Sequence, residues 1–361
     1  MLMIEDDMMN YTDDGVPASV FNAFGWDDPV VTIIAAGHIN QTFRVALGQR
    51  GQRLCVLQRV NPIFGPAVHY DIDAVTCHLE GMGLLTPRLI RTTNDELWFL
   101  DEFGALWRAM TWVDGENHTS AESPELCYEA GKLVAGFHLA VRDFKYKFRN
   151  ERLGVHDTAA HLKRLAEALD EKDYHRLYEE VAPLAEEVQN RLGKLPSLKG
   201  LPSRIVHGDL KISNLMFSPE GEGVCLIDLD TLAYMSVPVE LGDAFRSWCN
   251  PAGENSADSE FSTGHYAEAL RGYMAGGGSW LSGEEIEAIP TGIETISLEL
   301  SARFLTDALL ESYFNWDRKN FSGAGEHNLH RARSQLSLAR SLSGKRDELR
   351  SITQDIFTRG D

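Results

Sequence analysis

Short hydrophobic runs rich in β-branched and aromatic residues mark the first third of the chain. Runs of this length, separated by turn residues, predict β-strands. We expect strands at residues 30–34, 42–45, 53–57, 97–100 and 106–110. The last two flank Gly104 and are predicted to form a hairpin, whereas residues 67–81 have helical spacing. The region from Val31 to Asp114 is therefore predicted to be a small sheet with one helix.

After Asp114 the hydrophobic positions repeat with a helical period. Ser123 followed by Pro124 is typical of a helix start, because serine caps a free N–H group and proline fits the first turn. Apolar residues continue at helical spacing to Val141, so a helix is predicted there. Further helical stretches are expected at about 159–191, which is highly charged, and at roughly 293–314, which is apolar. Between these two, strand and turn signals return from Arg204 to Asp230.

Together the patterns predict an α+β fold of two lobes. The 361 residues are many for one compact core. We place a small β-rich lobe with a hinge in residues 1–113 and a larger, mainly helical lobe in residues 114–361. The hydrophobic content of 43% and charged content of 24% are those of an ordinary globular protein.

The charge balance narrows the possible partners. Lys and Arg number 34 against 54 Asp and Glu, for a formal net charge of −20. This net negative charge argues against nucleic acid and anionic membrane as the main partner. The opening ten residues are acidic where a signal peptide needs positive charge, and no apolar run reaches the roughly 20 residues of a membrane span. We expect a cytoplasmic protein.

The cysteines predict neither a zinc site nor a disulfide framework. They are five in number and scattered, with no C-x-x-C pair. We interpret them as small buried hydrophobic residues.

The segment from Ile205 to Thr231 carries most of the candidate chemistry. Its polar residues, separated by apolar ones, are His207, Asp209, Lys211, Asn214, Asp228 and Asp230. We expect short strands joined by a turn at 218–223, in a hairpin that brings the positions after Val206 and after Ile227 to one edge.

Phosphoryl transfer explains these residue types. The reaction needs a carboxylate to orient an acceptor hydroxyl and hard oxygen ligands for Mg²⁺. In this interpretation Asp209 accepts the hydroxyl proton, Asn214 and Asp228 bind metal, and Lys211 neutralises charge on the transferred group. A lone Asp or Asn more often has a turn or capping role, but the combined spacing of these residues favours the catalytic interpretation. A histidine before such a turn is more often a hydrogen-bonded anchor than an acid or base, so we assign His207 to orientation of the loop.

The run His207-Gly208-Asp209-Leu210-Lys211, with Asn214 five residues after Asp209, resembles the aminoglycoside phosphotransferase and choline kinase family, which has the protein-kinase fold. Further motifs resemble its N-acetylhexosamine 1-kinase branch. They are residues 37–40, Leu57-Gln58 with Asn61, residues 227–231, Gly242-Asp243, residues 303–305 and residues 326–329.

The resemblance implies that ATP and Mg²⁺ are the cofactors. Residues 37–41, with Gly37, His38 and Asn40, would cover the ATP phosphates. Residues 110–113, with Met110 and Trp112, would be a hinge that reads adenine through its backbone. A hairpin turn and a plain linker are the alternatives for these two segments.

Phosphate anchoring departs from the usual pattern. Kinases of this fold carry a lysine on the third strand, which grips the α- and β-phosphates. Gln58 stands at that position, and the neighbouring Arg59 points to the opposite face by strand alternation. Asp73 is the candidate for the helix acid that would pair with such a lysine.

The resemblance also implies acceptor and support residues. Asp230, Thr231 and Arg303 are expected to bind the acceptor, with Tyr313 as part of an apolar wall. Core packing is the alternative for Tyr313. For Arg303 the alternative is an ion pair with Asp307, four residues along the helix. Asp243 is expected to support the catalytic loop from below or to cap a helix.

We interpret the chain as a small-molecule kinase. The leading hypothesis is transfer of the ATP γ-phosphate to a sugar hydroxyl, the anomeric hydroxyl of an N-acetylhexosamine or related sugar. An amine-bearing acceptor such as an aminoglycoside, choline or homoserine is the alternative, and it would require a strongly acidic pocket. A nucleotide-binding pseudokinase is a third reading. The sequence leaves the oligomeric state open.

Overall fold

The computed structural model describes residues 15–34, 40–48, 53–150, 156–253, 255–256 and 259–359. The chain divides into two compact units. Unit 1 contains residues 1–114 together with 147–150, and unit 2 contains residues 115–146 and 151–361. The division at 114/115 lies next to the predicted boundary, but the short segment 147–150 returns to unit 1.

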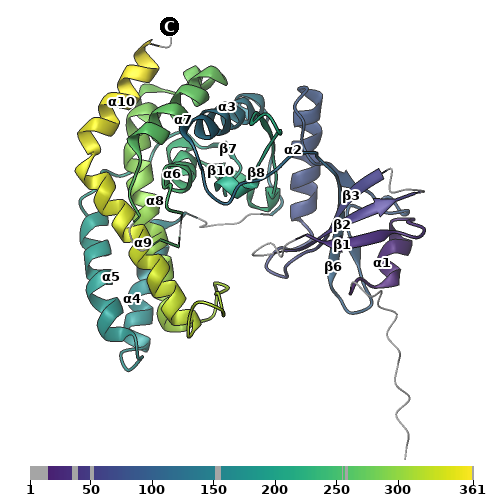
Figure 1. The fold of residues 1–361 in the computed structure, drawn as a ribbon, viewed down its shortest axis with the longest axis horizontal. Helices are drawn as coiled ribbons and strands as arrows, with labels where there is room; N and C mark the ends of the chain where they lie inside the picture. Colours follow the sequence, from purple (N-terminus) through teal and green to yellow (C-terminus); the bar gives the residue numbers. More distant parts are fainter. Residues whose placement is uncertain are drawn as a thin grey trace, which may run out of the picture. The chain divides into compact units, whose positions relative to one another are not determined.

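Unit 1 is built on an antiparallel sheet in the order β1-β2-β3-β6-β4, with β5 paired to β6 (Figure 1). Its strands are β1 (Val30–Ile33), β2 (Gln41–Leu47), β3 (Arg53–Arg59), β4 (Leu89–Ile90), β5 (Phe99–Leu100) and β6 (Leu106–Thr111). All the strands predicted from the sequence are present, and the β5–β6 hairpin is confirmed by pairing of Phe99 with Trp107. The two-residue strand β4 was not predicted.

One face of this sheet is the core of unit 1. Phe43, Leu57 and Ala109 lie opposite one another on β2, β3 and β6 and are all 0% exposed. Helix α1 (Ala18–Ala23) contributes Val20 and Phe21 to the same cluster. Because side chains alternate along a strand, the residues between these positions point to the other face.

The remaining helix of unit 1, α2 (Val68–Gly81), confirms the helix predicted at 67–81. Its buried Asp71 accepts hydrogen bonds from the backbone N–H groups of Arg149 and Asn150, both at 2.8 Å. These two bonds explain why residues 147–150 belong to unit 1.

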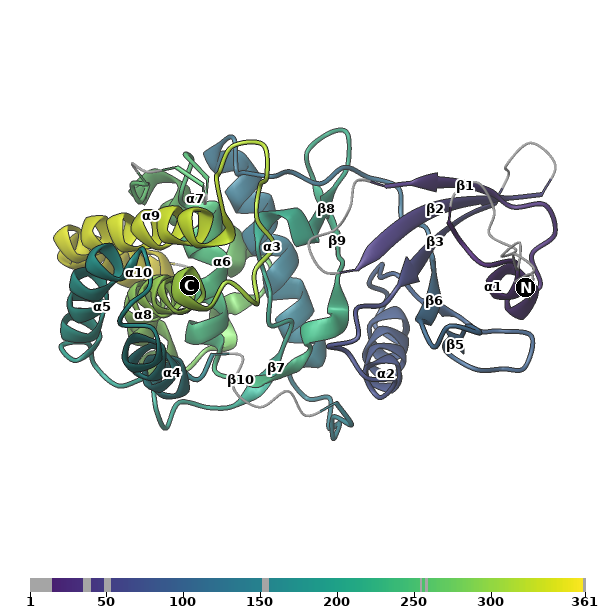
Figure 2. The same cartoon turned by 90° about the horizontal axis from the view of Figure 1, so that it is seen from below.

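Unit 2 is mainly helical (Figures 1 and 2). Its helices are α3 (Pro124–Val141), α4 (Thr158–Glu171), α5 (Tyr178–Leu192), α6 (Val237–Trp248), α7 (Thr263–Ala275), α8 (Gly283–Leu310), α9 (Ala324–Gly344) and α10 (Arg346–Arg359). The predicted start of α3 is confirmed, since Ser123 Oγ accepts a hydrogen bond from Leu126 N and Pro124 opens the helix. Within the described residues, none of the helices combines the length and apolarity that a membrane crossing needs.

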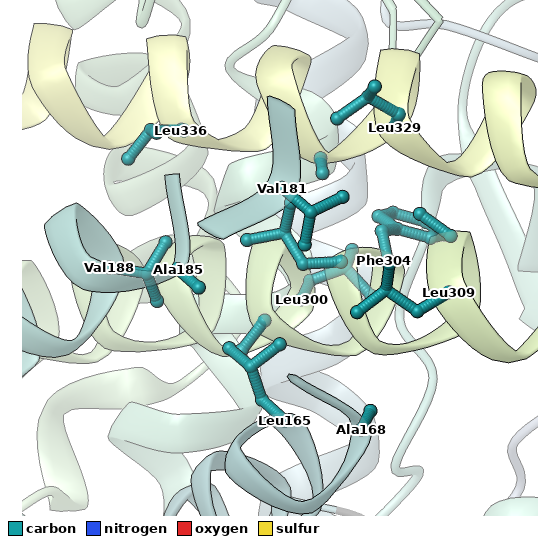
Figure 3. Close-up of a cluster of buried hydrophobic side chains, with 14 of the residues drawn as sticks. Leu165, Ala168, Val181, Ala185, Val188, Leu300, Phe304, Leu309, Leu329 and Leu336 are labelled. Carbon is teal, nitrogen blue, oxygen red and sulfur yellow. The ribbon is translucent and has the colours of Figure 1, made fainter. Parts of the chain in front are cut away.

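The core of unit 2 lies around α8 (Figure 3). Leu300 and Phe304 of α8 contact Leu165 of α4, Val181 of α5 and Leu329 of α9 within one buried cluster. The expected bounds of 293–314 were wrong for this helix. Ser282 and Glu285 form a capping box that starts it about ten residues earlier, with Pro290 inside it. It ends at Leu310, where Glu311 adopts a left-handed conformation.

The strands around the candidate chemistry form two pairs, not one hairpin. β7 (Arg204–Val206) pairs with β10 (Ala233–Met235), and β8 (Leu215–Phe217) pairs with β9 (Gly223–Leu226). The β8–β9 hairpin around residues 218–222 lies against α3 (Figure 2). The prediction of a tight turn was correct, whereas the partner expected for the segment after Val206 was wrong.

Four of the cysteines are buried, as the sequence predicted, but Cys77 on α2 is exposed. No disulfide joins any of the five.

Candidate active site

The candidate catalytic loop begins where β7 ends. Gly208 has a φ of +85°, a region that L-residues avoid. A Cβ atom at this position would also come within 2.3 Å of the Thr231 carbonyl oxygen. The chain therefore needs glycine directly before Asp209 to make this turn.

His207 holds the loop through both of its ring nitrogens. The backbone N–H of Asp209 donates to Nδ1 at 3.3 Å, and Nε2 faces the Ile227 carbonyl oxygen at 2.9 Å. Because Nδ1 accepts, the proton must be on Nε2, which donates to Ile227. Burial lowers the pKa of His207, which is 0% exposed, so the neutral ring is favoured. This geometry fits an anchor and not a proton-transfer group.

Asp209 is oriented by two neighbouring side chains. Lys211 Nζ donates to Oδ2 at 2.9 Å and Asn214 Nδ2 donates to the same oxygen at 3.0 Å. Within the described residues, Oδ1 accepts no hydrogen bond, and the side chain is 25% exposed. Burial raises the pKa of Asp209, but the Lys211 ammonium, His207 and Arg246 lower it by more, so it lies below the usual 3.8. The carboxylate is therefore ionised at neutral pH and keeps one oxygen available for an acceptor.

The donors needed for a divalent cation lie on the same loop and on the end of β9. Asn214 Nδ2 is used by Asp209, which leaves Asn214 Oδ1 as a hard oxygen ligand. The backbone N–H of Ile227 donates to the Asn214 carbonyl at 2.9 Å, so Asp228 follows a residue that is bonded directly to Asn214. Asp228 has a φ of +63°, in the left-handed region that non-glycine residues occupy infrequently and that recurs at active sites. The chemistry of this donor set fits Mg²⁺.

Helix α6 supports the loop from beneath, through residues that the sequence reasoning missed. Glu240 Oε1 accepts from Gly208 N at 2.8 Å, and Trp248 Nε1 donates to the Leu210 carbonyl at 2.7 Å. The other oxygen of Glu240 is hydrogen-bonded to His138 Nε2, whose Nδ1 faces the hydroxyl of Tyr273 at 2.9 Å. A buried polar chain from α7 through α3 and α6 thus fixes the catalytic turn.

The supporting role predicted for Asp243 was therefore assigned to the wrong carboxylate. Asp243 lies inside α6, so it is no N-cap, and its Oδ1 accepts from Arg246 Nε and Nη2 at 2.9 and 2.7 Å. Helical spacing explains the error, since Glu240 lies one turn earlier on the same side of the helix. Gly242 has a packing role, because a Cβ there would come within 2.6 Å of the Gly292 backbone.

Two predicted acceptor residues, Asp230 and Thr231, lie in a short 3₁₀ turn that follows Asp228. Thr231 Oγ1 donates to the His207 carbonyl at 2.8 Å, so its hydroxyl helps to hold the catalytic loop. Asp230 is 1% exposed. The turn is thus part of the framework of the loop.

The ion pair of Arg303 with Asp307, which was the alternative to acceptor binding, does not form within the described residues. Asp307 instead accepts hydrogen bonds from the backbone N–H groups of residues 312, 313 and 314 and from Asn328 Nδ2. The Arg303 guanidinium lies 5.7 Å from the centre of the Phe314 ring. Tyr313 lies beyond the end of α8 and is 61% exposed, so it is not a core residue.

A buried group near Arg303 was not anticipated from the sequence. Glu299, one turn earlier on α8, accepts from Thr158 Oγ1 at 2.6 Å and from His156 Nδ1 at 2.9 Å. The charges of Asp243 and Arg303 both act on His156, which places all of these groups in one neighbourhood of unit 2.

The candidate nucleotide residues belong to unit 1. Gly37 and His38 lie outside the described residues. Asn40 Oδ1 accepts from Asn61 N at 2.9 Å and joins two loops. Met110 lies on β6 opposite Val56.

Two more residues of this group make side-chain hydrogen bonds. Trp112 Nε1 donates to Asp114 Oδ1 at 2.8 Å. Gln58 contacts both Thr42 and Arg108. Asp73 forms ion pairs with Arg88 and Arg91, so its charge is already compensated within unit 1.

Comparison with known proteins identifies the family. A sequence profile of the phosphotransferase enzyme family matches residues 30–276, which is more than half of the chain. A curated relative, a homoserine kinase from Neisseria meningitidis serogroup B, is 28% identical over 199 residues. That match covers 54% of this chain and 57% of the relative, so the chain spans little more than half of the relative's length.

Solved structures confirm the predicted fold. An aminoglycoside phosphotransferase from Alicyclobacillus acidocaldarius has a TM-score of 0.59 at 16% identity, with 92% of this chain and 97% of that chain covered. An amicoumacin kinase in complex with AMP-PNP and Ca²⁺ has a TM-score of 0.58 at 15% identity, with 91% and 94% covered. The fold is therefore the protein-kinase-like fold of aminoglycoside phosphotransferases, with an antiparallel N-terminal sheet and a larger helical part.

Proposed function

Since the chain belongs to the phosphotransferase enzyme family, we propose that it is an ATP- and Mg²⁺-dependent kinase that phosphorylates a hydroxyl group of a small molecule. The observation that carries this proposal is the orientation of Asp209, which is held by Lys211 and Asn214 and keeps Oδ1 open. An ionised carboxylate in this position is suited to accept a hydroxyl proton.

Each residue of the loop has a part in the proposed mechanism. Asp209 orients the acceptor hydroxyl and takes its proton as the oxygen attacks the γ-phosphorus of ATP. The bond from that phosphorus to the bridging oxygen of the β-phosphate breaks, and ADP leaves. Asn214 and Asp228 would hold Mg²⁺, which when bound neutralises charge on the phosphates. Lys211 adds positive charge beside the transferred group, and His207 keeps the carboxylate in place. The amicoumacin kinase complexed with AMP-PNP and Ca²⁺ supports nucleotide and divalent metal as the cofactors.

For the acceptor we propose a sugar, phosphorylated on its anomeric hydroxyl. The Asp243 carboxylate is paired with Arg246, and the Glu299 carboxylate is paired with His156. Neither carboxylate is left as an uncompensated anion for an ammonium group, which supports a neutral acceptor.

The second candidate acceptor is an amine-bearing alcohol. The 28% identity to a homoserine kinase favours it. A zwitterionic acceptor would place its carboxylate, and not its amine, near Arg246 or Arg303. This candidate keeps the mechanism at Asp209 and changes only the acceptor.

A screen of ATP consumption with hexoses, N-acetylhexosamines, homoserine, choline and aminoglycosides would separate the two candidates. Mass spectrometry would identify the phosphorylated product. For a sugar substrate, a 1-deoxy analogue should not react and a 6-deoxy analogue should react. Faster turnover of homoserine or an aminoglycoside than of any sugar would overturn the sugar assignment and leave the kinase assignment in place.

Variants of the acceptor side extend this test. Asp230→Ala and Arg303→Ala should each raise the KM for the sugar, because their loss leaves buried hydrogen-bonding groups of the complex unpaired. The KM for ATP should change much less. An equal rise in both KM values would remove these residues from the acceptor site.

A nucleotide-binding protein without catalysis is the remaining possibility. The presence of Asp209, Asn214 and Asp228 argues against it. Isothermal titration showing Mg²⁺-dependent ATP binding, together with no turnover on any compound of the screen, would instead support it.

A further inference from the structure

Three residues form a polar row across the sheet of unit 1, on the face opposite its hydrophobic core. Thr42, Gln58 and Arg108 lie directly opposite one another on β2, β3 and β6. Arg108 Nε donates to Gln58 Oε1 at 2.8 Å, and Gln58 Nε2 donates to Thr42 Oγ1 at 3.1 Å. Arg108 is 1% exposed and Gln58 is half-buried. The position that carries a lysine in related kinases therefore has a buried guanidinium bound to it.

The two neighbours in this row, Arg108 and Thr42, allow the Gln58 side-chain amide only one orientation. A guanidinium can only donate, so the oxygen of the amide must face Arg108 and its nitrogen must face Thr42. One hydrogen of Nε2 is used by Thr42, and the second has no acceptor among the described residues. This N–H group is held in a fixed position by the two neighbours, and such fixed donors bind anionic oxygens well.

The charge of the sheet supports an anionic ligand. The strands of unit 1 contain four arginines, Arg44, Arg53, Arg59 and Arg108, and no Asp or Glu among their described residues. By strand alternation Arg53 and Arg59 belong to the core face of the sheet, so Arg44 and Arg108 supply the positive charge of the polar face. Arg44 lies on the same face as Arg108, because it pairs with Val56, two residues before Gln58.

We propose that Arg108 is the positioning residue for the phosphates of the nucleotide and that it acts through Gln58. Gln58 contacts a phosphate oxygen with its second Nε2 hydrogen. Arg108 fixes the amide and supplies the positive charge that a third-strand lysine would otherwise bring. In this chain the positive charge lies on β6, whereas in related kinases it lies on the third strand, which corresponds to the neighbouring strand β3. This inference rests on the proposed function, because it names how that site holds its nucleoside triphosphate.

If Arg108 had only a structural role, its loss would have a different effect on nucleotide binding. A guanidinium that only fills the interior would, when lost, weaken binding of every nucleotide equally through damage to the sheet. A guanidinium that acts on phosphates would affect ligands according to the number of phosphates they carry. The two roles are therefore separated by comparing ATP and ADP with adenosine.

The experiment measures Kd for Mg·ATP, ADP and adenosine by isothermal titration with the full chain. Arg108→Met should weaken ATP and ADP binding by about 10- to 100-fold, the range expected for a charge-assisted hydrogen bond. Adenosine binding should change by less than about twofold. Adding Gln58→Lys to this variant should restore part of the ATP affinity, because a cation returns to the third strand. Arg59→Met is the matched control, since it removes an arginine from the other face of the same strand.

The possible outcomes are distinct. If Arg108→Met does not fold, Gln58→Leu tests the same contact and should show the same selective loss for ATP and ADP. Equal losses for all three ligands, or unchanged ATP binding in either variant, would overturn the role of Arg108 and leave the kinase assignment standing. If the unmodified protein binds no ATP at millimolar concentration, the proposed function itself fails.

Discussion

Two segments of unit 2 each contain an aspartate and a histidine, but the aspartate has a different role in each segment. The catalytic segment, residues 207–214, contains Asp209 and His207, and the distal segment, residues 307–328, contains Asp307 and His327. In each, the histidine Nδ1 accepts a backbone N–H, from Asp209 at 3.3 Å and from Asp317 at 3.1 Å. Both rings are buried and have a lowered pKa.

The aspartates differ in what surrounds them. Asp209 is 25% exposed, and within the described residues its carboxylate accepts hydrogen bonds from two side chains on a single oxygen. Asp307 is 3% exposed, and both of its oxygens are saturated, by three backbone N–H groups and Asn328. An aspartate with a free oxygen at the surface can act on a ligand, whereas a saturated buried one stabilises a turn. Residue type and spacing alone do not separate the two.

The largest expected effect is that of Asp209→Asn. We expect kcat to fall by about 10² to 10⁴, because the amide cannot accept the acceptor proton. ATP affinity and thermal stability should change little, since the contacts of Asp209 are local. Steady-state kinetics and ATP titration would measure this. A variant with nearly normal kcat would make Asp209 a turn residue like Asp307.

The metal ligands should give the next largest effect. Asp228→Ala should lower activity severely and raise the Mg²⁺ concentration for half-maximal rate by more than about tenfold, because the cation loses an anionic ligand. Asn214→Ala should act in the same direction but more weakly, since its oxygen is neutral. Mg²⁺ titrations of the reaction rate provide the test. Curves that match the unmodified protein in both variants would contradict the metal assignment.

The matched change Asp307→Asn should affect stability and not chemistry. It replaces one accepting oxygen by a donor, which leaves buried N–H groups without a partner and costs about 2–4 kcal/mol in the free energy of unfolding. Urea unfolding of Asp307→Asn and Asp209→Asn side by side would measure the contrast. If Asp307→Asn is as stable as the unmodified protein but loses kcat, the comparison drawn between the two segments is wrong.

The smallest effect concerns the pH dependence of stability. Burial, with Arg331 and His330, lowers the pKa of His327 to about 4. The unfolded chain takes up this proton near pH 6.5 and the folded chain does not, so stability should fall as pH drops from 6.5 towards 4. His327→Asn keeps an acceptor for Asp317 N and should reduce this slope. Unfolding free energies at pH 7 and 5 would show it, and an unchanged slope would contradict a neutral His327.

Much of the catalytic segment could be predicted from the sequence, because its chemistry is local. Asp209, Lys211 and Asn214 lie within six residues of one another, so their spacing alone brings them together. The turn after Phe217 and the start of α3 at Ser123 were also predictable, since turn and capping preferences act over a few residues. The strands of unit 1 followed from their hydrophobic runs in the same way.

Tertiary structure alone decided which distant groups complete each site. Glu240 reaches Gly208 across 32 residues, Arg108 reaches Gln58 across 50, and Asn328 reaches Asp307 across 21. The sequence suggested Asp243, Gln58 by itself and Arg303 instead. The physical reason is that hydrogen bonds between distant residues depend on how helices and strands pack, and packing reflects the sum of many weak contacts. No local pattern encodes that sum.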